Sequence, residues 1–197
     1  RIGYISGKLL QDHVVKAEIL LHGSFATTGI GHGTDKALIA GLLGMRPDDI
    51  RIPDSFFLAK KDGMEFSFST ITLKDAHPNT AVLRLTGEHG RKIEVQAASI
   101  GGGRILIAKL DGIEVNFSAE KPTLIVHNVD QPGHVAQVTS MLAEKQVNIA
   151  TLQLYRDKRG GYAVMVIETD QEVPEESVAW LEQLDGIIKV TYINVEE

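Results

Sequence analysis

The spacing of apolar residues predicts two helices and a strand at the start of the chain. Residues 1–12 carry apolar side chains near helical spacing, and residues 13–21 read as a strand. Residues 35–43 place their apolar positions on one side, which predicts a helix with Thr34 or Asp35 as its N-cap. The glycine that follows this helix is a typical C-terminal stop.

Short runs with strand character fill most of the remaining first half. The predicted strands, which follow a short helix ending near residue 62, are 65–73, 81–86, 92–98, 104–110 and 113–117. The first of these runs changes phase near Ser69 and Thr70, which predicts a β-bulge. Asp111-Gly112 is a strong hairpin signal. Residues 1–118 are therefore predicted to form an α+β domain with a largely antiparallel sheet.

A different order of elements follows residues 119–121, which we expect to form a linker. Residues 122–197 read as strand, helix, strand, strand, helix and strand, with the last strand at 187–195. A weak internal repeat relates residues 128–131 to residues 168–171, and each copy lies between a strand and a helix. Two split βαβ units of this kind predict a ferredoxin-like sandwich.

Composition then excludes several classes of function. The chain has 197 residues, a net charge of −6 and no run of lysine and arginine, so a nucleic-acid surface is not expected. No apolar run approaches the ~20 residues of a membrane-spanning helix, and no signal peptide is visible. The absence of cysteine excludes a thiolate nucleophile and an iron–sulfur cluster held by this chain, and it suits a cytoplasmic protein. The first residue is Arg1 rather than methionine, so we expect the natural chain to begin earlier.

Residues 22–44, HGSFATTGIGHGTDKALIAGLLG, are the most unusual segment of the first half. They contain two His-Gly steps and a glycine alternation between a strand and a helix, which predicts a mobile loop at a helix N-terminus. The side chains that this loop offers for catalysis or ligand contact at an interface are His22, Ser24, His32, Thr34 and Asp35. Two alternatives stay open, namely an allosteric amino-acid pocket and a purely structural loop. The segment lacks the spacing of a phosphate-binding P-loop, and its two histidines have no evident third zinc ligand.

A turn at residues 128–134 is the candidate ligand site of the second half. Pro132 fixes the turn, Gly133 allows a ligand to approach the backbone, and the helix N-terminus attracts a carboxylate. Asn128 and Asp130 are placed to add side-chain contacts, the latter to an ammonium group or a cation. The alternative is a capped helix that binds nothing.

Residues 122–197 resemble an ACT domain in their element order and in their D-x-P-G and x-V-N-I motifs. ACT domains are regulatory modules that pair with one another and often bind amino acids at the pairing interface. The resemblance is closest to the serine-responsive module of phosphoglycerate dehydrogenase, and it implies a ligand site at Asn128, Asp130, Gln131, Gly133, His134 and Asn148. Asn128 stands where that module has a histidine, and Asp130 stands where it has an asparagine. A carboxylate at Asp130 disfavours a ligand carboxylate nearby and favours a monovalent cation such as K⁺.

The 22–44 motif together with the ACT tail resembles the β chain of iron–sulfur-dependent bacterial L-serine dehydratases, which joins an ASB-type domain to an ACT domain. The resemblance implies a partner α chain whose cysteines hold a [4Fe–4S] cluster, and conversion of L-serine to pyruvate and ammonia, a step that links amino-acid metabolism to gluconeogenesis. It further implies that this chain is inactive alone, that it forms a homodimer through its ACT domains, and that L-serine or another small amino acid is its allosteric effector. The family normally has a Ser-rich, His-containing segment before the position of Arg1.

Two other functions stay open at this stage. The chain is either a free-standing amino-acid-sensing ACT protein or the C-terminal regulatory fragment of a phosphoglycerate dehydrogenase. The GHGTDKA letters within residues 22–44 favour the dehydratase.

Overall fold

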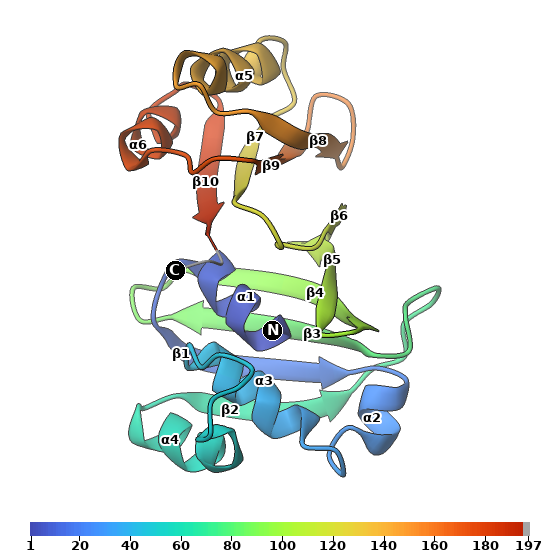
Figure 1. Ribbon diagram of the computed structural model, residues 1–197. Helices are drawn as coiled ribbons and strands as arrows, with labels where there is room; N and C mark the ends of the chain where they lie inside the picture. The colour runs from blue at the N-terminus through green and yellow to red at the C-terminus, as the bar shows by residue number, and fades with distance from the viewer. Residues whose placement is uncertain (195–197) are drawn as a thin grey trace. The chain divides into compact units, whose positions relative to one another are not determined.

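The computed structural model describes residues 1–194, and its mixed α+β architecture confirms the predicted fold class (Figure 1). The chain divides into two compact units, Arg1–Gly112 and Ile113–Glu197. The division falls at the Asp111-Gly112 turn, whereas the sequence placed the end of the first domain at residue 118. No helix in the described part of the chain is long and apolar enough to cross a membrane.

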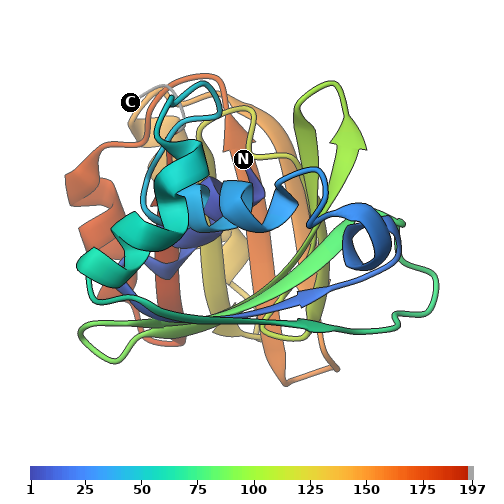
Figure 2. The ribbon, with the colours of Figure 1, turned by 90° about the horizontal axis from the view of Figure 1, so that it is seen from below.

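Helices cover one face of a mainly antiparallel sheet in the first unit (Figure 2). The helices are α1 (Ile2–Leu10), α2 (Ser24–Thr28), α3 (Thr34–Leu42) and α4 (Ser55–Lys61), with the 3₁₀ turn η1 (Ile52–Asp54) before α4. The strands are β1 (Val14–Leu21), β2 (Glu65–Thr70), β3 (Thr80–Gly87), β4 (Lys92–Gly101) and β5 (Arg104–Leu110). The same sheet also includes β6 (Ile113–Phe117), the strand with which the second unit begins. Their order is β2-β1-β3-β4-β5-β6, and the β1–β2 pair is parallel. The pairs β1–β3, β3–β4 and β4–β5 are antiparallel, as the sequence predicts.

Inward-facing positions of the central strands form the core of this unit. Ile19, Leu83 and Val95 are paired across β1, β3 and β4, and all three are fully buried. Helix α1 buries Ile5 and Leu9. Burial of such side chains stabilises the fold by about 1.5–3 kcal/mol each, and it fixes the face on which α1 lies.

The predicted bulge near Ser69 and Thr70 is wrong. The β1–β2 register runs without interruption from Lys16↔Glu65 to Leu21↔Thr70, and the strand ends there. Phe66 and Phe68 point to the same face of β2, where both rings pack near Phe56 of α4. Their ring centroids lie 5.0 and 6.0 Å from the centroid of Phe56. The change of phase therefore marks the end of an edge strand.

Hydrogen bonds of Asp12 join the β3–β4 hairpin to the segment just before β1. Its carboxylate accepts hydrogen bonds from the backbone N–H groups of His13 (2.8 Å) and His89 (2.9 Å), and it lies 2.8 Å from Nδ1 of His89. The Asp12 side chain is only 4% exposed. The hydrogen bond with His89 lowers the pKa of Asp12 and, in turn, raises the pKa of His89.

We expect this pair to make stability depend on pH. The lowered carboxyl pKa contributes stability above its ordinary value of 3.8 that is lost as pH falls, and the raised imidazole pKa contributes stability below 6.5 that is lost as pH rises through the raised value. Melting temperatures of the wild type and of His89→Asn should therefore differ more at pH 6 than at pH 9. Equal differences at both pH values would contradict the assignment.

The second unit is a four-stranded antiparallel sheet with two helices on one face. After β6, its elements are β7 (Thr123–Val129), α5 (His134–Glu144), β8 (Ile149–Arg156), β9 (Tyr162–Thr169), α6 (Glu175–Glu182) and β10 (Ile187–Ile193). The strand order β10-β7-β9-β8 confirms the predicted ferredoxin-like βαββαβ fold. Val138, Leu142 and Leu181 of the helices share one core with the inward side chains of β7 and β9. The predicted end of the last strand, residue 195, lies outside the described residues.

Candidate functional site

A cavity of about 520 Å³ in the first unit lies beside the unusual loop. Its walls come from the first turn of α1, from α2, from the start of α3 and from the β4–β5 turn. The polar residues among its lining include Arg1, His32, Thr34 and Ser99, and Phe25 supplies an aromatic wall. Such a mixture of apolar walls and a few polar groups is typical of a small-ligand site.

The cavity owes its shape to a close crossing of α1 and α3. Neither Gly3 nor Gly41 has room for a side chain: a Cβ atom at Gly3 would overlap the carbonyl of Leu38, and one at Gly41 would overlap the backbone nitrogen of Tyr4. The two helix backbones therefore touch, which holds the first turn of α1 against the C-terminal half of α3. The wall residues Arg1 and Thr34 depend on this contact for their positions.

Helix α3 begins differently from the prediction. Gly33 is its N-cap with a φ of 73°, so the prediction of Thr34 or Asp35 as N-cap is wrong. A left-handed backbone costs glycine little, which lets the chain turn sharply into the helix. Asp35 lies in the first turn, where its carboxylate accepts a hydrogen bond from the N–H of Lys36 (2.8 Å). Its negative charge also interacts favourably with the helix dipole.

The segment predicted as a mobile loop contains the short helix α2. The hydroxyl of Thr28 donates to the carbonyl of Ser24 (2.9 Å), and a Cβ atom at Gly29 would overlap the carbonyl of Phe25. The Gly29 carbonyl then accepts a hydrogen bond from the N–H of Thr34 (2.8 Å). The loop is therefore tied to both flanking helices by its own backbone.

The structure separates the five sequence-predicted residues into two groups. His32 and Thr34 line the cavity, whereas His22, Ser24 and Asp35 do not. The ring of His22 is half-buried, and its Nδ1 lies 3.2 Å from the backbone nitrogen of Leu73 and 3.3 Å from the carbonyl oxygen of Ile71. His22 thereby secures the segment after β2.

Sequence reasoning missed Arg1, Phe25 and Ser99 as cavity residues. The Arg1 guanidinium donates to the carbonyl of Gly103 (3.2 Å), a contact between residues 102 positions apart. The three-glycine turn at 101–103 was the only local signal, and it indicated flexibility rather than a wall. Only the tertiary fold brings this turn beside α1.

In the second unit, the predicted turn contains two buried polar atoms without a partner. Asn128 is 3% exposed; its amide donates to the carbonyl of Val129 (2.7 Å), while its Oδ1 has no hydrogen bond. His134 is 7% exposed; its Nδ1 lies 3.1 Å from Oε1 of Gln137, and its Nε2 has no hydrogen bond. Buried groups of this kind cost stability unless something satisfies them, so they suit a ligand.

Asp130, in the same turn, already has partners. Its carboxylate accepts hydrogen bonds from the backbone N–H of Gly160 (2.9 Å) and from the Arg156 guanidinium (3.2 Å). The Gly160 bond, followed by that of Arg156, holds the pKa of Asp130 below its usual value. The neighbouring residues Gln131 and Gly133 are exposed, and Gly133 is the N-cap of α5 with a φ of 104°.

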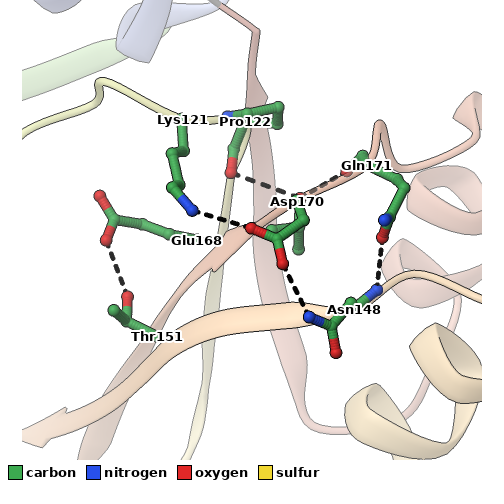
Figure 3. A network of polar contacts seen from close by, with 8 residues as sticks. Lys121, Pro122, Asn148, Thr151, Glu168, Asp170 and Gln171 are labelled. Atoms are coloured by element: carbon green, nitrogen blue, oxygen red, sulfur yellow. Dashed lines mark hydrogen bonds and ion pairs between the residues drawn. The ribbon is translucent and has the colours of Figure 1, made fainter.

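Asn148 lies at the other end of the sheet from this turn. Its neighbour Ile149 pairs with Thr169, whereas Asn128 pairs with Ala163 at the opposite end of β9. The Asn148 amide donates to Oδ2 of Asp170 (2.7 Å), as Figure 3 shows. Within one chain, the predicted ligand residues therefore do not form a single site.

A second hollow, of about 630 Å³, lies between α5 and α6. It is lined by Met141 and by the half-exposed ring of Trp180, and the Lys145–Glu176 ion pair (3.5 Å) spans it. None of the sequence-predicted site residues lines it. Nowhere in residues 1–194 do three or more histidine, aspartate or glutamate side chains gather as a metal site would require.

Comparison with known proteins identifies both units. Residues 4–59 match the family model described as "Serine dehydratase beta chain", and residues 122–186 match that of the ACT domain. The chain is 33% identical over 196 residues to the β chain of L-serine dehydratase from Peptoniphilus asaccharolyticus, an alignment that covers 99% of this chain and 88% of that protein. It is 35% identical over 193 residues to the probable β chain of L-serine dehydratase from Bacillus subtilis (strain 168), covering 98% and 87% respectively. The chain belongs to the serine dehydratase β-chain family.

Membership of the serine dehydratase β-chain family confirms the resemblance found in the sequence. The family match at residues 4–59 covers most of α1 and all of α2 and α3, and therefore His32 and Thr34 of the cavity. A weaker similarity, 27% over 198 residues, relates 98% of the chain to 36% of the D-3-phosphoglycerate dehydrogenase of Methanocaldococcus jannaschii. The similarity therefore extends to about a third of that dehydrogenase.

Proposed function

We propose that this chain is the β subunit of an L-serine dehydratase, an L-serine ammonia-lyase that is active only when a partner α chain is present. The observation that carries the proposal is the similarity of nearly the whole chain to β chains of this enzyme. The residues of this chain do not suit the [4Fe–4S] cluster that the family resemblance implies, because there is no cysteine among them. The cluster is therefore assigned to the α chain.

Reconstitution tests this proposal. The β chain and a cysteine-bearing α chain, mixed without oxygen, should form pyruvate from L-serine, and either chain alone should form little. Full activity of the α chain alone would show that the β chain is not essential. A free-standing amino-acid sensor or a dehydrogenase fragment would restore no serine-dependent pyruvate formation, so the same experiment separates the competing functions.

The cavity beside His32 is the part of the β chain that we assign to the shared function. The exposed imidazole of His32 and the hydroxyl of Thr34 are presented beside the N-terminus of α3. An imidazole can move a proton near neutral pH, and a helix N-terminus favours a carboxylate. The second candidate is an allosteric amino-acid pocket within this unit, which the cavity's polar lining and its volume favour.

We further propose that the ACT unit forms a homodimer through strand β8. This strand is at the edge of the sheet, and its side chains Leu152 and Leu154 are exposed. Both pair with core residues of β9, so they lie on the helix-covered face without being covered. Pairing of β8 with β8 of a second copy around a two-fold axis would bring Asn148 of one copy toward residues 128–134 of the other. The dimer thereby reunites the separated ligand residues.

Leu154→Lys should convert this dimer into a monomer. Leu154 is 48% exposed in the isolated chain, so the change introduces a charge at the proposed interface without disturbing the core. Light scattering after size-exclusion chromatography measures the mass. Ile188→Lys, on the opposite edge strand, is the matched control and should stay dimeric. A monomer from the Ile188 variant alone would place the interface at β10.

Calorimetry with L-serine and with K⁺ tests what the ACT unit binds. We expect L-serine to bind, because Asn128 and His134 each offer a buried unsatisfied acceptor or donor at the turn. Potassium should give little heat, since Arg156 already neutralises the Asp130 carboxylate. Heat with K⁺ and none with L-serine would reverse the assignment, and no heat with either would leave the unit a dimerisation module.

A further inference from the structure

Asp170 forms hydrogen bonds with two different segments of the second unit (Figure 3). One carboxylate oxygen, Oδ2, accepts a hydrogen bond from the side-chain amide of Asn148 (2.7 Å). The other, Oδ1, accepts one from the ammonium group of Lys121 (2.8 Å). The backbone N–H of Asp170 also donates to the carbonyl of Asn148 (3.0 Å), so the two residues are joined twice.

Lys121 lies on the connection between the two sheets. Residues 118–122 join β6, the last strand of the six-stranded sheet, to β7 of the four-stranded sheet. Within this connection Ala119 is buried and has a φ of 53°, a conformation that a residue with a side chain adopts only when its surroundings hold it there. The N–H of Thr169 donates to the carbonyl of Pro122 (2.9 Å) and supplies a second tie.

We propose that Asp170 relays the binding of an effector at Asn148 to the connection between the two sheets. This proposal rests on the effector role given to the ACT unit above and names how that role is transmitted. A ligand that accepts a hydrogen bond from the Asn148 amide takes away a donor of Asp170. The Asp170 carboxylate then loses the contact that orients it toward Lys121, and the connection loosens at Lys121.

The charges around Asp170 support a relay rather than a static brace. The ion pair of Lys121 with Asp170 is solvent-exposed, and exposed pairs of this kind are individually weak, so a ligand can displace one. Glu168 lies near Lys121, but its carboxylate accepts a hydrogen bond from the hydroxyl of Thr151 (2.8 Å). Lys121 therefore depends on Asp170 for its hydrogen bond, whereas Glu168 adds only charge.

Thermodynamic reciprocity gives the relay a measurable consequence. If effector binding has to break the contact between Asp170 and Asn148, part of the binding free energy is spent on breaking it. Removing the contact by mutation should therefore raise the affinity for the effector by the factor that the contact costs. Asp170→Ala should raise the affinity for L-serine about fivefold, the lower end of ordinary coupling. Glu168→Gln is the matched control, because it removes a nearby charge and leaves the Asp170 contacts in place.

The experiment combines calorimetry with hydrogen exchange of residues 118–121 in the full chain, with L-serine as the probe. In the wild type, L-serine should bind and should speed exchange at these residues. In Asp170→Ala, exchange should be fast without ligand, and L-serine should not change it further. Glu168→Gln should behave as the wild type in both measurements.

Three results overturn the relay, and calorimetry of the wild type separates the first two from the third. If L-serine binds the wild type but exchange at 118–121 does not change, or if Asp170→Ala leaves the affinity unaltered, then the relay is wrong while the effector role stands. If calorimetry detects no L-serine binding to the wild type, then the effector role fails and the relay falls with it.

Discussion

Gly41→Ala should lower the free energy of unfolding by about 1–3 kcal/mol, the usual cost of overpacking a tight contact. The new methyl group would overlap the backbone nitrogen of Tyr4 and approach the backbone of Gly3, neither of which can rotate away as a side chain could. Helices α1 and α3 must therefore separate. Because the cavity residues Arg1 and Thr34 lie at the N-termini of these two helices, the reconstituted enzyme should also lose activity. Urea denaturation and a pyruvate assay measure the two effects.

Gly7→Ala is the matched control for this change. Gly7 lies in the same helix pair, but a Cβ atom there would be 3.6 Å from the nearest atom, the carbonyl oxygen of Leu42, which is an ordinary contact. Replacing a helical glycine without a clash should stabilise the protein by about 0.5–1 kcal/mol. Equal effects of Gly7→Ala and Gly41→Ala on stability would show that α1 and α3 do not cross in contact at these glycines.

His32→Ala should lower serine turnover of the reconstituted enzyme on the order of 100-fold, the lower end of what a positioned proton-transfer group contributes. The His32 side chain is exposed and lines the cavity, so its removal should not unfold the β chain. Melting temperature and assembly with the α chain should stay at wild-type values. Steady-state kinetics with L-serine then isolates the loss in the chemical step.

His77→Ala is the control for His32→Ala. His77 is also exposed but lies outside the cavity, where its Nδ1 accepts a hydrogen bond from the N–H of Asn79 (3.1 Å). Its loss should leave turnover unchanged. An unchanged rate for His32→Ala would give His32 a structural role only. An unchanged rate together with loss of inhibition or activation by an amino acid would favour the allosteric pocket.

Periodicity predicted most elements because local spacing decides them. The strands at 104–110 and 113–117 have the bounds that alternation or an apolar run indicates. It failed at β2, because the end of a parallel edge strand is set by its partner β1 and not by its own sequence. It also missed α2, since five residues of helix between glycines carry no periodic signal.

The candidate sites were predicted less completely, for a related reason. Residue type and loop chemistry identified His32 and Thr34, but nothing local distinguishes them from His22, which serves the backbone of Leu73. In the ACT unit, the motif names Asn128 and Asn148 together, while strand register places them at opposite ends of β9. Contacts between distant segments, or between chains, decide which residues share a site.

The half-exposed indole between α5 and α6 also gives the molecule a natural spectroscopic label. Trp180 is the only tryptophan of the chain, and it belongs to the second unit. Its fluorescence therefore follows unfolding of the ACT unit alone, whereas the amide circular dichroism follows the helices of both units. Coincident transitions by the two signals would mean that the units unfold as one cooperative block, and a gap between them would measure how independently the ACT unit folds.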